Sequence, residues 1–135
     1  TALRSAVVHQ EVTLTASASN IADLVRASAH RGPNHAALVD VTTANSYTWA
    51  EFDAAVDGEA HRLVRAGVRP GDRVVVRLPT GPEFCVAVFG VLRAGGVLVP
   101  AGPGQPTREL QRLVADSGAE LLVGHGLCEG VAQNR

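Results

Sequence analysis

Three short runs rich in valine and leucine, separated by two segments of helical length, constrain this chain more than any other feature of its sequence. The runs are "RVVVRLP" at 73–79, "GVLVP" at 96–100 and "AELLVG" at 119–124. The first is continuous enough in valine to be buried on most of both faces, which is typical of a parallel sheet. Connections of helical length also imply parallel strands joined by right-handed crossovers. We therefore predict an α/β fold with a parallel βαβαβ core.

The two segments between these runs carry helix start and stop signals. Residues 82–93 are almost all apolar, and a helix that is apolar all round is a buried helix. Thr80 and Glu83 have the spacing of a capping box for this helix, and the glycine pair 95–96 ends it. The second helix covers 107–118 and presents three apolar side chains, Leu110, Leu113 and Val114.

The first half of the chain predicts two more helices and a small antiparallel hairpin. Asn20 is expected to cap a first helix, which "HRGPNH" ends. "AALVDV" and "SYTW" are typical of two strands joined by a turn at 42–45. Thr48 and Glu51 form a second capping box, and the helix behind it ends at Gly67. Its apolar residues recur every three or four positions: Trp49, Phe52, Val56, Ala60 and Leu63.

We divide the chain into three parts on these grounds. Residues 1–19 are an N-terminal extension with a possible edge strand at 7–15, residues 20–124 are the α/β subdomain, and residues 125–135 are a truncated C-terminal tail. The sequence does not begin with methionine, which leaves open a native start upstream. Its first residues lack the apolar core of a secretory signal, and no apolar run approaches the roughly 20 residues of a membrane span.

Composition excludes several classes of partner. The chain has 135 residues, 46% of them apolar and 19% charged, with a net charge of −1. This balance fits one globular domain and gives no reason to expect nucleic acid or an anionic membrane surface as a partner. Two cysteines do not make a disulfide framework, so we expect a cytoplasmic location. Cys85 is expected to pack as a small reduced hydrophobe, and His125 with Cys128 supplies too few ligands for a metal site.

The stretch "LRAGGVLVPAGPGQPTREL" raises the question of a phosphate-binding loop. A strand precedes it and a helix follows it, and Gly102 and Gly104 fit the first two positions of a dinucleotide-binding motif, with Thr107 in place of the third glycine. Pro103 and Pro106 argue against that role, because such a loop binds phosphate through backbone N–H groups and proline has none. An independent nucleotide-binding domain remains an alternative, but a stiff scaffold corner explains the residues better.

Other candidate residues are few. All 12 basic residues are arginine, so no Walker loop and no chemistry that needs a lysine ammonium is available in this chain. Asp53 and Asp57 lie four residues apart on one helix face, which favours a solvated face over a catalytic pair. Asp116 and Ser117 lack the strand–turn–helix context of a catalytic serine. We expect no catalytic, cofactor-binding or metal-binding residue in this chain.

Taken in order, these segments resemble the N-terminal part of the acyl-adenylate-forming superfamily, which includes acyl-CoA synthetases, fatty-acyl-AMP ligases and peptide-synthetase adenylation domains. "YTWAEFD" looks like the first core motif of that family and "LRAGGVLVP" like the second, and the likeness covers about 20–124. "GPEFCVAVFGVLRAG" looks more like the acyl-CoA and fatty-acyl-AMP ligases than the peptide-synthetase domains.

The resemblance implies a two-step ligase. A carboxylate attacks the α-phosphorus of ATP with magnesium present, and a thiol, usually coenzyme A, then takes the acyl group. The family's phosphate loop and its lysines come later in its chain, and this sequence has no "SGTTG"-like run. We therefore expect an N-terminal fragment of a fatty-acid–CoA ligase that is inactive alone. The alternatives are a non-catalytic interaction module and the independent nucleotide-binding domain. As partners we expect a second copy of the chain or the remainder of the synthetase.

Overall fold

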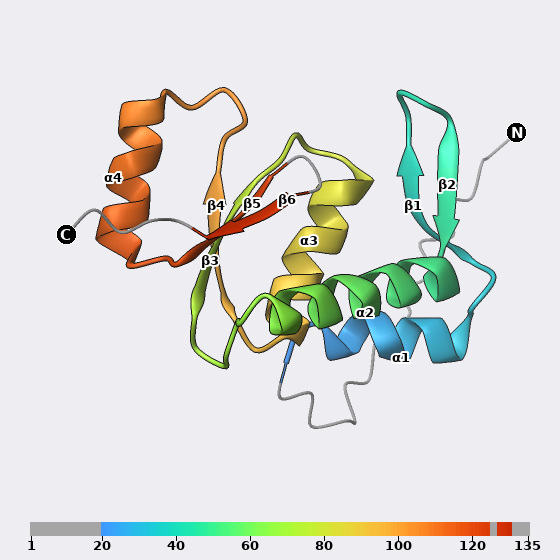
Figure 1. The fold of residues 1–135 in the computed structure, drawn as a ribbon. Coiled ribbons are helices and arrows are strands. Elements are labelled where there is room, and N and C mark those ends of the chain that lie inside the picture. Colours follow the sequence, from blue (N-terminus) through green and yellow to red (C-terminus); the bar gives the residue numbers. More distant parts are fainter. Residues whose placement is uncertain (1–19, 125–126, 131–135) are drawn as a thin grey trace, which may run out of the picture.

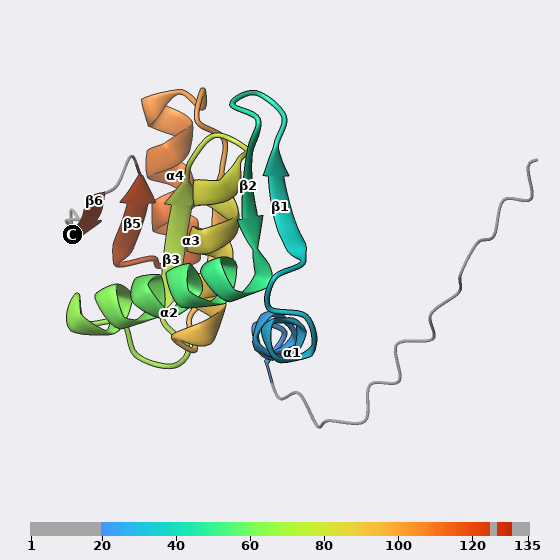
Figure 2. The same cartoon turned by 90° about the vertical axis from the view of Figure 1, so that its right-hand side faces the viewer.

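The structure is a computed structural model, and it describes residues 20–124 and 127–130. The predicted strand at 7–15 lies outside the described residues. Along the chain the elements are α1 (Asp23–Arg31), β1 (Ala36–Asp40), β2 (Asn45–Thr48), α2 (Trp49–Arg65), β3 (Arg73–Arg77), α3 (Pro82–Arg93), β4 (Val97–Ala101), α4 (Thr107–Ser117), β5 (Leu121–Gly124) and β6 (Leu127–Gly130). Figures 1 and 2 show their arrangement from two sides.

The main sheet has the strand order β4-β3-β5-β6. Strand β3 runs parallel to both β4 and β5, so the predicted parallel βαβαβ core is confirmed. Strand β6 pairs with β5 in the antiparallel direction, with Gly124 opposite Leu127. Part of the segment expected to be a C-terminal tail, residues 127–130, therefore forms a strand at the edge of this sheet.

Alternate valines of β3 point to opposite faces of the sheet, and each face has its own helices (Figure 1). Val74 and Val76 pack with residues of α2 and α3, while Val75 lies in the cluster that α4 covers. All three valines have no exposed surface. The continuous apolar run of β3 is thus explained by helices on both sides of the sheet.

The predicted hairpin and the helix behind it are confirmed. Strands β1 and β2 pair in the antiparallel direction. The Thr48 side chain accepts a hydrogen bond from Glu51 N, and a Glu51 carboxylate oxygen accepts from Thr48 N at 2.8 Å, which completes the capping box. The Glu51 carboxylate accepts a second hydrogen bond from Thr48 Oγ1 at 3.0 Å. The bonds from Thr48 N and Thr48 Oγ1 favour the ionised carboxylate, so they hold the pKa of Glu51 below its ordinary value.

The other two predicted helix caps are wrong. Helix α3 begins at Pro82 with Gly81 as its N-cap, so Thr80 lies one residue too early to cap it. Proline is favoured at the first helical position, and it sets that boundary. The Asn20 carboxamide oxygen accepts a hydrogen bond from Ala22 N at 2.9 Å, which stabilises the turn before α1 rather than the helix itself.

Helix α3 is less buried than its apolar sequence predicts. Its buried residues are Ala87, Gly90 and Val91, and most of the remainder are half-buried. A Cβ at Gly90 would lie 2.5 Å from Glu59 Cγ, so this glycine lets α2 and α3 cross closely. The outer side of α3 is only partly covered by the described chain, which is why an all-round apolar helix keeps exposed surface here.

Replacing Thr48 by alanine tests the capping box. We expect the free energy of unfolding to fall by about 1 kcal/mol at neutral pH, since a helix N–H loses its acceptor. The folded-state pKa of Glu51 is lowered, so its stabilisation is present above the unfolded-state pKa near about 4.3 and is lost as the pH falls through the folded-state value. The effect of Thr48→Ala on urea unfolding is therefore expected to shrink in acid. Thr80→Ala is the matched control, and a loss as large as that of Thr48→Ala would contradict this assignment.

Candidate functional site

The glycine-containing loop between β4 and α4 is held by one arginine from the neighbouring strand. Arg77, the last residue of β3, donates hydrogen bonds from Nη2 to the carbonyl oxygens of Pro103 and Gln105, both at 3.1 Å. Gln105 N donates to Gly102 O at 3.1 Å, which closes a turn within the loop. The loop therefore points two carbonyl oxygens at the guanidinium of Arg77. A phosphate-binding loop instead points backbone N–H groups at its ligand, so this loop does not have that geometry.

Gly102 and Gly104 are not required by the close packing of another part of the chain against this loop. A Cβ built at Gly102 or Gly104 would meet no atom within 4 Å, and neither residue has a positive φ. In a dinucleotide-binding motif the glycines allow tight turns and close contacts. The geometry supports the interpretation of the loop as a scaffold corner. By contrast, Gly95 has a φ of 82°, and a Cβ at Gly96 would lie 3.1 Å from Val91 Cγ1, as predicted for the corner before β4.

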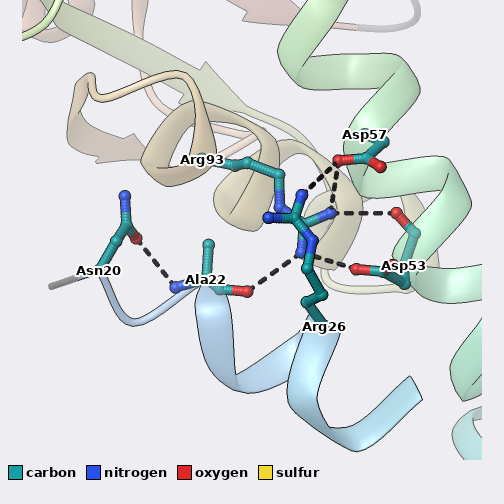
Figure 3. Close-up of polar contacts among 6 residues, drawn as sticks. All are labelled: Asn20, Ala22, Arg26, Asp53, Asp57 and Arg93. Carbon is teal, nitrogen blue, oxygen red and sulfur yellow. Dashed lines mark hydrogen bonds and ion pairs between the residues drawn. The ribbon is translucent and has the colours of Figure 1, made fainter. Parts of the chain in front are cut away.

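The strongest polar cluster in the described chain centres on Arg93, the last residue of α3 (Figure 3). Its Nη2 donates to Asp53 Oδ1 at 2.7 Å and to Ala22 O at 3.1 Å, and its Nη1 donates to Asp57 Oδ1 at 2.8 Å and to Asp53 O at 3.2 Å. The Arg93 side chain is 8% exposed, whereas that of Arg26, which also binds Asp57, is 46% exposed. The expected solvated face is found only in part: both carboxylates bind this guanidinium, and Asp53 is 20% exposed whereas Asp57 is 43% exposed.

This Arg93 cluster fastens α1 to the two longer helices. Asn20 Nδ2 donates to Leu92 O, next to the bond between Arg93 and Ala22 O. In the sequence Arg93 is only a basic residue at the end of an apolar helix, where it suits the helix dipole. Its partners lie 36 to 71 residues away along the chain, so no local pattern identifies them. The cluster has the geometry of a structural clamp, since both terminal nitrogens of Arg93 donate to protein acceptors, while its buried Nε has no hydrogen-bond partner among the described residues.

The remaining candidate residues have local roles or lie outside the described side chains. Ser117 Oγ donates to Val114 O and accepts from Ala119 N, which closes the end of α4. Asp72 accepts from Arg69 N at 2.8 Å and closes the turn before β3. Cys85 is a half-buried free thiol whose pKa is raised by burial. His125 lies outside the described residues, and the side chain of Cys128 is not described.

The clefts on the described part of the chain include the following three. One of about 420 Å³ borders Arg93, one of about 210 Å³ borders Tyr47 and Glu83, and one of about 270 Å³ lies between α1, β1, α2 and α3. Within the described residues no group of three or more His, Cys, Asp or Glu side chains is placed to hold a metal ion. Over the same residues no helix is long and apolar enough to span a membrane.

Comparison with known sequences decides the family. The profile described as "AMP-binding enzyme" matches residues 25–134. This chain belongs to the AMP-binding enzyme family. The match begins within α1 and covers Arg93 with Asp53 and Asp57, the glycine-containing loop and the whole parallel core.

Three similar proteins illustrate the range of this family. The chain is 42% identical over 99 residues to "Triostin synthetase I" from Streptomyces triostinicus, covering 73% of this chain and 18% of that protein. It is 37% identical over 106 residues to "Salicyl-AMP ligase / salicyl-S-ArCP synthetase" from Mycobacterium tuberculosis, covering 76% and 19%. The solved N-terminal domain of FACL13 from Mycobacterium tuberculosis matches with a TM-score of 0.73 and 30% identity, covering 76% of this chain and 26% of that one. The chain thus spans about a fifth of the length of these two sequence relatives.

Proposed function

We propose that this chain is the N-terminal part of an ATP-dependent, AMP-forming acid ligase. In that reaction a carboxylate oxygen bonds to the α-phosphorus of ATP, the bond to the β-phosphate oxygen breaks, and magnesium pyrophosphate leaves. The observation that carries the proposal is the family match over residues 25–134. ATP and Mg²⁺ are accordingly the expected cofactors of the whole enzyme.

Residues 20–124 have a scaffold role in this proposal. The chain contains no lysine, so it supplies no ammonium group to the phosphates. What it supplies is a parallel sheet with fixed corners: Arg77 holds the loop after β4, and Arg93 holds α1 against α2 and α3. Such a scaffold positions groups that other parts of a ligase contribute.

For the substrate we propose a fatty acid, with coenzyme A as the acyl acceptor. The support is the likeness of "GPEFCVAVFGVLRAG" to acyl-CoA ligases and the 30% identity to a mycobacterial fatty acyl CoA synthetase. The names of other relatives include a salicyl-AMP ligase and a tripeptide synthetase, so aryl acids and amino acids are the competing classes. The proposal therefore needs a test that separates three kinds of carboxylate.

ATP–pyrophosphate exchange with the 135-residue chain is the first measurement. We expect no exchange above the protein-free blank with fatty, aryl or amino acids, because the chain has no lysine to bind the phosphates. Clear turnover by the pure chain, abolished by a core-disrupting substitution, would overturn the scaffold role.

A chimera tests the family role directly. Residues 20–124 replace the matching segment of the mycobacterial salicyl-AMP ligase, and a second chimera carries Val75→Asp in the buried centre of the sheet. The first is expected to keep salicylate-dependent exchange and the second to lose it. A folded first chimera that activates no acid would refute the proposed role. Gain of fatty-acid-dependent exchange beside the salicylate activity would support the fatty-acid assignment, whereas exchange with salicylate alone bears only on the scaffold role.

A further inference from the structure

We draw no further inference here: the strongest candidate, the apolar groove of about 270 Å³ between α1, β1, α2 and α3 with Ile21 and Leu24 along it, carries none, because nothing in the structure shows what covers this face of a chain that spans about a fifth of the length of its sequence relatives.

Discussion

The free energy of unfolding is expected to fall by about 3 kcal/mol when Arg93 is replaced by methionine, because the change removes one member of a buried ion pair. Methionine keeps the apolar stem of the side chain and removes only the guanidinium. Asp53 then loses its cation while remaining largely buried, at 20% side-chain exposure. Two carbonyl oxygens, those of Ala22 and Asp53, lose a donor in the same step. Urea unfolding monitored by circular dichroism measures the loss.

Arg26→Met is the matched control for this prediction. Arg26 binds the same Asp57 oxygen at 3.1 Å, but both side chains of this pair are nearly half exposed, Arg26 at 46% and Asp57 at 43%. An ion pair in that setting contributes about 0–1 kcal/mol, because water screens both charges. Equal losses for Arg26→Met and Arg93→Met would show that burial does not distinguish the two arginines, and the clamp assigned to Arg93 would be wrong.

The order of strands and helices could be predicted because each element carries its own local pattern. Val74, Val75 and Val76 indicate a strand buried on both faces, and the structure buries all three. The capping box of α2 spans only four residues, so both partners are visible in one short stretch. The left-handed conformations of Gly67 and Gly118 at helix ends follow in the same way from their place after an apolar stripe, and both residues have a positive φ.

The errors arise where the conformation of a residue depends on a neighbouring residue or element that the local sequence pattern does not include. Thr80 and Glu83 match a capping box by spacing, but Pro82 moves the helix start by one residue. Strand β6 pairs with the edge of β5, and "LCEG" itself carries no pattern that predicts a strand. Asp53 and Asp57 look solvated in their own helix, and only the packing of α3 against α2 brings Arg93 to them.

The candidate site was harder to predict than the fold for the same reason. The glycine-containing loop is conspicuous in sequence, yet its geometry depends on Arg77, 26 and 28 residues away from its two acceptors. An arginine inside "RVVVRLP" gives no sign that it will hold a loop beyond the next strand. Long-range polar contacts of this kind join two elements that are each predicted from their own sequence. Neither sequence names the other element, so the contact can be identified only in the folded structure.

Replacing Val75 by aspartate is expected to leave the chain unfolded at 25 °C. Val75 lies on the central strand with no exposed surface, packed with Ala101 and Ala119 and covered by α4. An ionised carboxylate without a partner in that position costs several kcal/mol, and a domain of this size has only about 5–15 kcal/mol of stability to lose. The same substitution also removes a well-packed apolar side chain, which adds to the loss.

Val97→Asp separates the effect of burial from the effect of aspartate in a strand. Val97 begins β4 at the edge of the same sheet and is 47% exposed, so its carboxylate would remain hydrated. We expect Val97→Asp to stay folded, with a loss of about 1 kcal/mol or less that reflects the lower strand preference of aspartate. Far-UV circular dichroism and thermal melting compare the two variants. A folded Val75→Asp with a melting temperature near that of Val97→Asp would mean that β3 is not the buried centre of the sheet. In that case the parallel core would have to be packed differently, with water reaching the face that α4 covers.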